Sequence, residues 1–132
     1  MSIQAILLPL FVQVALTFAL LFWMAFARIG VIKRKEAKMA DIALGQPNWP
    51  PKVQQIGNSY HSQFQIPLLF YVLVALAILT KSADLLFVVM SWAFVLTRLL
   101  HAYIHTTSNT VRHRFNAFAA GAMILLAMWV IF

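Results

Sequence analysis

Residues 1–27 read MSIQAILLPLFVQVALTFALLFWMAFA, and none of them carries a charge. The hydrocarbon core of a bilayer is about 30 Å thick, and an α-helix needs about 20 residues to cross it. Residues 53–80 and 115–132 also lack Asp, Glu, Lys and Arg. A fourth run, Leu85 to Thr97, becomes long enough if Arg98 lies toward one membrane face. The sequence therefore predicts an all-α integral membrane protein. Its single domain, residues 1–132, is a bundle of four transmembrane helices at about residues 4–27, 57–80, 84–105 and 114–132.

The composition agrees with a membrane protein. Of the 132 residues, 63% are hydrophobic and 10% are charged, whereas a soluble domain has roughly 45–50% apolar and about 25% charged residues. The chain has no cysteine, which excludes disulfides, thiolate metal sites and cysteine nucleophiles. Its 4 glycines are scattered, so there is no glycine-rich loop for a nucleotide phosphate.

The basic residues predict the orientation. The chain has 10 Lys and Arg against 3 Asp and Glu. Nine of the basic residues lie in or beside the connections at about 28–56 and 106–113, and Lys81 alone lies in the connection between them. Because cytoplasmic loops collect Lys and Arg, we expect the first and third connections in the cytoplasm and both termini outside. Topology thus explains the charge, with contact to anionic lipid headgroups as a further consequence. No nucleic-acid partner is expected.

The first helix is expected to remain uncleaved. Ala25, Phe26 and Ala27 are similar to a signal-peptide cleavage site, but no basic residue precedes the apolar run. The run is also longer than the usual 7–15 residues of a signal peptide. A compact chain of four spans suggests a bacterial inner membrane.

Polar side chains share one face of the expected helix at 84–105. Arg98, His101 and His105 are spaced i, i+3 and i+7, which places them on the same side of a helix. They lie in its last two turns, close to Asn109 and to Arg114 at the start of the next expected helix.

A second polar set begins the expected helix at 57–80, with Asn58, Tyr60, Gln63 and Gln65. Tyr60, Gln63 and Pro67 are also spaced i, i+3 and i+7 and are expected to share a face. Pro67 has no N–H, so the Gln63 carbonyl loses its helical donor. The two sets lie at similar depth, and we expect them to converge on a pocket. Arginine, amides and imidazoles with few acids favour an anionic ligand that carries carboxylates.

Other interpretations remain open for these residues. Arg98 could extend to the headgroups, and Pro67 could be a tolerated kink. The side chains of Gln13, Thr17 and Gln63 could simply form hydrogen bonds between helices and bind no ligand. His61 and His113 are expected to face solvent or lipid. His101 and His105 have a metal-chelating i, i+4 spacing, but too few ligands surround them, and no metal site is predicted; a metal or haem site stays an alternative.

The pattern resembles the MAPEG family, the membrane-associated proteins of eicosanoid and glutathione metabolism. The features that carry the resemblance are four short helices, a basic first connection, the stretch Asn58-Ser59-Tyr60-His61-Ser62-Gln63-Phe64-Gln65-Ile66-Pro67, and Arg98-Leu99-Leu100-His101. It implies a homotrimer with sites between subunits near the cytoplasmic side. There glutathione, as cosubstrate, is held by arginines and polar groups, and its thiolate attacks a lipophilic electrophile.

By position, the resemblance assigns cosubstrate binding to Arg98, His101 and Gln63, and a catalytic role near the thiol to Arg114. From the chemistry of the residues themselves, Asn109, Asn58 and Tyr60 are expected to help bind the cosubstrate, and His105 is expected to relay a proton as a second catalytic residue. Ser59 and Tyr60 stand where the family usually has arginine and asparagine, Gln63 where it commonly has glutamate, and His105 where it has tyrosine. The resemblance therefore predicts a glutathione-dependent transferase or peroxidase. These departures leave open a non-enzymatic protein of the same fold, acting as a scaffold, a lipid-binding element or an accessory subunit of a larger membrane complex.

Overall fold

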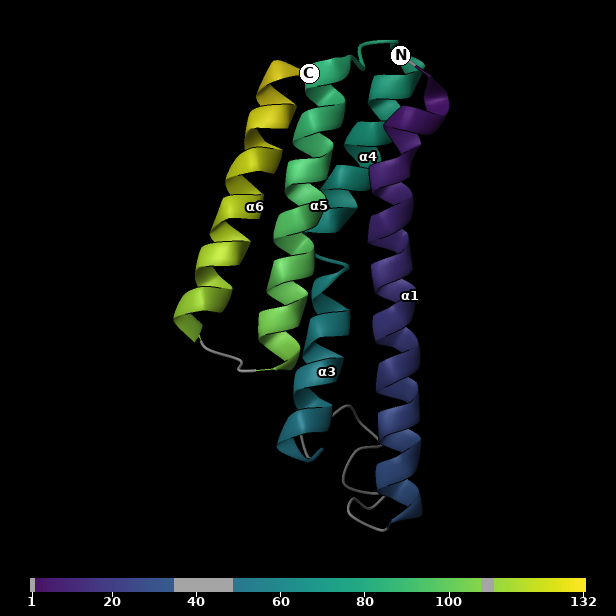
Figure 1. The fold of residues 1–132 in the computed structure, drawn as a ribbon, viewed down its shortest axis with the longest axis vertical. Coiled ribbons are helices and arrows are strands. Elements are labelled where there is room, and N and C mark those ends of the chain that lie inside the picture. Colours follow the sequence, from purple (N-terminus) through teal and green to yellow (C-terminus); the bar gives the residue numbers. More distant parts are fainter. Residues whose placement is uncertain (1, 35–48, 108–110) are drawn as a thin grey trace.

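The computed structural model describes residues 2–34, 49–107 and 111–132. Within these residues the helices are α1 (Ile3–Lys33), α3 (Pro51–Ser62), α4 (Ile66–Leu79), α5 (Leu85–Thr106) and α6 (Val111–Ile131). They supply four stretches long and apolar enough to cross a membrane, with α3 and α4 together forming the second. The predicted four-helix membrane bundle is confirmed. Both termini lie at one end of the bundle (Figure 1); the opposite end, with Lys33, Pro51 and Thr106, is called the distal end below.

The connection between α4 and α5 is tight because its residues fit a short turn. Lys81 adopts a positive φ of 56°, and Asp84 follows it at the N-cap of α5. The Asp84 carboxylate accepts a 2.9 Å hydrogen bond from the Phe87 N–H, which satisfies one of the unpaired donors of the first turn. The two helices therefore run antiparallel, and the rings of Phe70 on α4 and Phe94 on α5 lie 4.9 Å apart between centroids.

The second membrane span differs from the continuous helix expected at 57–80. It starts earlier, because Pro51 occupies the first helical turn of α3, where a missing N–H costs nothing. It then breaks at residues 63–65, about halfway along the bundle (Figure 1). Here the N–H groups of Gln63, Phe64 and Gln65 bond to carbonyls three residues back. Helix α4 restarts with Pro67 in its first turn, so proline produces a break here and not a kink.

Helix α1 also exceeds its expected range of 4–27 and continues to Lys33. It extends past the distal ends of α5 and α6 (Figure 1). No proline lies between Ala27 and Lys33, so nothing in this stretch breaks the helix at the end of the apolar run.

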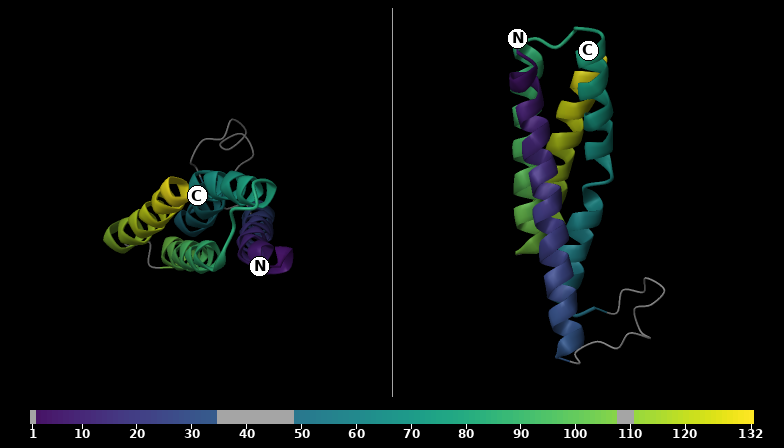
Figure 2. Two further views of the ribbon diagram at one scale, coloured as in Figure 1. Left: turned by 90° about the horizontal axis from the view of Figure 1, so that it is seen from above. Right: turned by 90° about the vertical axis from the view of Figure 1, so that its right-hand side faces the viewer.

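Helix α5 is central to the bundle and packs against α1, α3 and α6. Viewed along the bundle, α1 and α6 flank it, and α3 and α4 complete the ring (Figure 2). The α5–α6 contact is close because Gly121 lacks a side chain: a Cβ there would lie 2.6 Å from the Thr97 hydroxyl. Small residues allow membrane helices to approach in this way.

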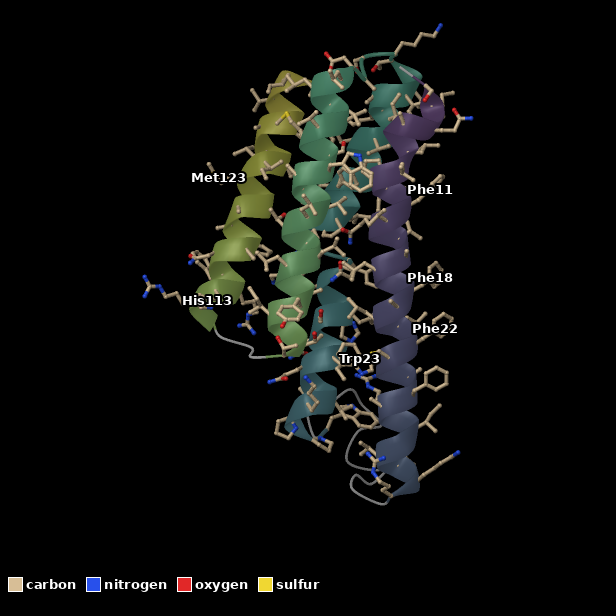
Figure 3. The ribbon with its side chains drawn as sticks, viewed as in Figure 1. Phe11, Phe18, Phe22, Trp23, His113 and Met123 are labelled. Carbon is tan, nitrogen blue, oxygen red and sulfur yellow. The ribbon has the colours of Figure 1, made fainter. Side chains whose placement is uncertain are left out.

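Aromatic and aliphatic side chains fill the bundle at the terminal end, with Phe70, Phe87, Phe94, Leu125 and Met128 among the most buried. Outward-facing side chains are equally apolar. Phe11, Phe18 and Phe22 project from α1 away from the other helices, and Met123 projects from α6 (Figure 3). Such an exterior is suited to lipid and not to water.

Candidate functional site

A pocket of about 440 Å³ opens between α3, α5 and α6 in the distal half of the bundle. Four of the residues predicted for the site line it: Asn58, His101, His105 and Arg114. The lining is completed by His61, Ser62, Gln65, Phe115 and Phe118. The α5 face predicted from the i, i+3, i+7 spacing thus points into the bundle, toward α3 and α6.

Arg98 lies directly behind the pocket wall. Its side chain is 0% exposed, so it does not extend to the headgroups. Its Nη2 donates to the Ser62 hydroxyl at 2.6 Å and to the Ser62 carbonyl at 3.2 Å. Its Nε and Nη1 are buried and find no acceptor among the described residues. A buried cation without a counter-charge favours an anion nearby, so Arg98 adds positive potential behind the pocket wall.

The chain's membrane spans hold no carboxylate to pair with Arg98. Its only acidic residues are Glu36, Asp41 and Asp84, and all three lie outside the four spans. A second copy of the chain would have the same spans and the same lack of acids. Among the described residues that line the pocket, Arg114 is cationic and none is acidic, a composition that favours an anionic ligand.

His101 and His105 form a pair on the pocket floor. Their rings are 5.4 Å apart between centroids and nearly perpendicular, at 80°. They are only 4% and 7% exposed, and the Nδ1 atom of each has no hydrogen-bond partner among the described residues. Across the pocket, the Phe118 ring lies 6.1 Å from that of His101. The pair adds two imidazoles to the polar side of the pocket, opposite the Phe118 ring.

The described part of the chain contains no group of three or more His, Cys, Asp and Glu placed to hold a metal ion. His61 shares the pocket with the histidine pair, but its ring packs on Tyr60 at 5.4 Å.

Gln63 and Tyr60, both predicted to bind the cosubstrate, do not line the pocket. Gln63 is buried and turned toward α1, where its Oε1 accepts a 2.7 Å hydrogen bond from Gln13 Nε2. Its own amide donates to the Ser59 carbonyl at 2.9 Å. Tyr60 packs its ring edge-on against Phe64 at 5.2 Å. Because α3 ends at Ser62, the face shared by Tyr60, Gln63 and Pro67 in a continuous helix does not exist.

The interhelical hydrogen bond was the other interpretation of Gln13 and Gln63, and the structure contains that bond. Thr17 donates to the Gln13 carbonyl within α1 at 3.1 Å and also interacts with the Tyr71 hydroxyl of α4. Asn109 lies outside the described residues. His113 is exposed and points away from the bundle (Figure 3).

Gln65 lines the pocket, as expected for the second polar set. His61, which was expected to face solvent or lipid, also lines it, and sequence reasoning missed Ser62, Phe115 and Phe118. Ser62 gave no signal of its own, because its role depends on a partner 36 residues away. Phe118 could have been found, since it follows Arg114 by one helical turn and so lies on the same face.

An apolar groove of about 350 Å³ adjoins the pocket toward the terminal end, between α4 and α6. It is lined by Ile66, Leu69, Ala122, Leu125, Leu126 and Trp129. Ile66 follows the pocket residue Gln65 directly, and Ala122 lies one turn beyond the pocket residue Phe118. Polar and apolar cavities thus lie end to end along one face of α6.

A family model described as the MAPEG family matches residues 6–132, nearly the whole chain. No curated protein and no solved structure matches the chain.

Proposed function

The chain belongs to the MAPEG family, and on that premise we propose that it joins glutathione, or a similar thiol with carboxylates, to a lipophilic electrophile or reduces that electrophile. The observation that carries the proposal is the cationic pocket without a carboxylate. Arg114 lines it, Arg98 lies buried behind Ser62 with two unpaired N–H groups, and the spans contain no acid. Arginine is the side chain best suited to hold carboxylates, through paired hydrogen bonds.

The residues present fit such a cosubstrate. When bound, glutathione supplies a thiol nucleophile and two carboxylates. Asn58 and Arg114 are placed on opposite helices to hold carboxylates from two sides of the pocket. Arg98 acts as a positioning residue: it fixes Ser62 and adds positive potential without touching the ligand. Asn109, which follows α5 in the sequence, is proposed as a further contact.

Two groups in the pocket suit the proton transfer. The positive charge of Arg114 favours loss of the thiol proton, and the imidazole of His105, which lines the pocket, is the proposed acceptor of that proton. His101 packs against His105 at right angles and holds its ring in place. In a conjugation, the sulfur forms the new bond to the electrophilic carbon, and the accepted proton passes to the leaving group.

The apolar groove between α4 and α6 supports a lipophilic second substrate. Its lining is almost entirely aliphatic and aromatic, and it begins where the polar pocket ends. A molecule with a reactive head and an apolar body would place the head among the histidines and the body against Leu125 and Trp129. Burial of the body would supply about 25 cal/mol per Å² of apolar surface.

A second candidate function is a non-enzymatic scaffold, lipid-binding element or accessory subunit of a larger membrane complex. Gln63 favours it, because this neutral residue is committed to Gln13 and stands where the family resemblance implies a glutamate. In this case the pocket would bind an anion without catalysing a reaction of it.

The assembly and location are also proposals. We propose a homotrimer in a bacterial inner membrane, with the distal end and its basic residues in the cytoplasm. The family resemblance supports the trimer, and the distribution of Lys and Arg supports the orientation.

Calorimetric titration of glutathione into the purified protein tests the function. We expect binding by the wild type, weaker binding in Arg114→Gln and unchanged binding in Arg112→Gln, a matched control whose side chain is exposed and outside the pocket lining. Absence of heat from the wild type up to millimolar glutathione would refute cosubstrate binding. Binding without turnover of any lipophilic electrophile would favour the non-enzymatic candidate.

A further inference from the structure

Two cations are fixed against indole rings on the side of the bundle that faces away from the pocket. The Arg28 guanidinium carbon lies 4.8 Å from the ring centroid of Trp49. The Lys52 ammonium lies 5.8 Å from the ring centroid of Trp23. We call these four residues the Arg28–Lys52 cluster. Trp23 lies on the side of α1 that faces α3 (Figure 3), so the cluster joins the distal halves of these two helices.

Further contacts hold both cations in position. Arg28 lies over Gly57 of α3, where a Cβ would come within 2.9 Å of its Nη2. A glycine at this point is what allows the guanidinium to lie against the helix. Lys52 donates a hydrogen bond to the carbonyl of Thr106, the last residue of α5. An ammonium has three donors, so two remain for a ligand.

The cluster lies at the depth of lipid headgroups. Helix α5 has 22 residues, or about 33 Å at 1.5 Å per residue, which is close to the thickness of the hydrocarbon core. Thr106, bonded to Lys52, therefore marks the distal membrane boundary. Helix α1, with 31 residues, is about 46 Å long and continues past this plane. Trp residues favour the same boundary, which agrees with Trp23 and Trp49.

No described acidic residue neutralises the cluster. Among the residues that the structure describes, the one acid is Asp84, which caps α5 at the opposite end of the bundle. Arg28 Nε is buried and has no hydrogen-bond partner in the described segments. The first turn of α3 contains no acid, and the N-cap residue Pro50 provides no side-chain hydrogen bond. Among the described residues, the charges at the cluster and the N-terminus of α3 are positive, which favours an anion.

We propose that the Arg28–Lys52 cluster binds the phosphate of an anionic phospholipid. At headgroup depth the phosphate is the abundant anion, and the two indoles provide apolar surface beside the start of the acyl chains. The site is separate from the pocket, which α3, α5 and α6 line, whereas the cluster lies between α1 and α3. Bound lipid would link α1 to α3 and, through Lys52, to α5.

Lipid-dependent stability in detergent micelles tests the proposal. We would measure the thermal unfolding midpoint with added phosphatidylglycerol, with phosphatidylcholine, and with millimolar inorganic phosphate. The expected result for the wild type is a rise of several degrees with phosphatidylglycerol only. The variant Arg28→Gln/Lys52→Gln should lose this rise, whereas Arg112→Gln, which removes a charge from the distal end outside the cluster, should keep it.

Other results would overturn the proposal. An equal rise in the double variant would show that phosphatidylglycerol acts elsewhere, and an equal effect of inorganic phosphate would assign the site to a soluble anion. Native mass spectrometry of the wild type serves if the double variant does not fold: retained phosphatidylglycerol in excess over phosphatidylcholine supports the site, and equal retention overturns it. Gly57→Ala, which keeps both cations but displaces Arg28, should weaken the retention.

Discussion

The Nη2 atom of Arg98 donates a 2.6 Å hydrogen bond to the Ser62 hydroxyl and a 3.2 Å bond to the Ser62 carbonyl. These bonds tie the middle of α5 to the last residue of α3, at the point where the second membrane span breaks. A side chain that seemed able to reach the headgroups thus serves inside the bundle, where it holds one wall of the pocket.

Replacement of Ser62 by alanine should destabilise the protein, because Arg98 would lose its shortest hydrogen bond in a buried position. The expected cost is about 1–3 kcal/mol of unfolding free energy, measured by reversible SDS denaturation in mixed micelles. Ser59→Ala is the matched control: the Ser59 hydroxyl is also buried in α3 but has no hydrogen-bond partner among the described residues. Equal losses in both variants would mean that the Arg98–Ser62 bond does not contribute.

A double-mutant cycle on Gln13 and Gln63 should show that they act as a pair. Gln63→Leu leaves the Gln13 amide without its 2.7 Å partner and should cost about 1–2 kcal/mol. The double variant Gln13→Leu/Gln63→Leu should recover most of that loss, with a coupling of about 0.6–1.7 kcal/mol. Glutathione binding should survive in the double variant. If the double variant no longer binds glutathione, Gln63 takes part in the binding site after all.

The bundle was predictable because hydrophobic length needs no knowledge of contacts. Charge-free runs such as residues 1–27 identify spans by composition alone. Where the structure differs, the cause is local backbone chemistry. Pro67 correctly indicated where the second span departs from a regular helix. The sequence does not distinguish a kink from a break at that point. The start of α3 at Pro51 was missed because three prolines in residues 47–51 suggested only a connection.

The candidate site was predictable only on α5, where Arg98, His101 and His105 lie on one regular helix. On α3 the break turned Gln63 toward Gln13 and left Ser62 and His61 at the pocket. Periodicity cannot supply such pairings, since they depend on how helices rotate against one another. The hydrogen bond between Arg98 and Ser62 is a tertiary contact, and the spacing of residues along the chain does not predict it.

Arg114→Gln should lower kcat/KM for glutathione conjugation about 10- to 100-fold. A hydrogen bond to a charged group contributes about 1.5–3 kcal/mol, and each 1.4 kcal/mol is about tenfold in rate. Arg114→Lys should recover part of the loss, because it keeps the charge without the planar fork. Thiolate absorbance of bound glutathione should fall in parallel. Unchanged thiolate in Arg114→Gln would contradict a role for Arg114 at the thiol.

Single cysteines can report the orientation cleanly, since the chain has none of its own. Lys33→Cys and Ser82→Cys introduce exposed thiols at opposite ends of the bundle. A membrane-impermeant maleimide should label Lys33→Cys in inverted membrane vesicles and Ser82→Cys in right-side-out vesicles. The reverse pattern would refute the cytoplasmic placement of the distal end.

Gly121→Ala should loosen the contact between α5 and α6, because its Cβ would lie 2.6 Å from the Thr97 hydroxyl. Thr97 cannot readily turn away: its χ1 is restricted by β-branching, and its hydroxyl donates to the Phe94 carbonyl. We expect a loss of about 1–3 kcal/mol in the free energy of unfolding, typical of overpacking. Thr97→Ala in the same chain removes the clashing oxygen and should restore most of the stability. If the double variant is no more stable than Gly121→Ala alone, the clash is not the cause, and the close approach of the two helices does not depend on this pair.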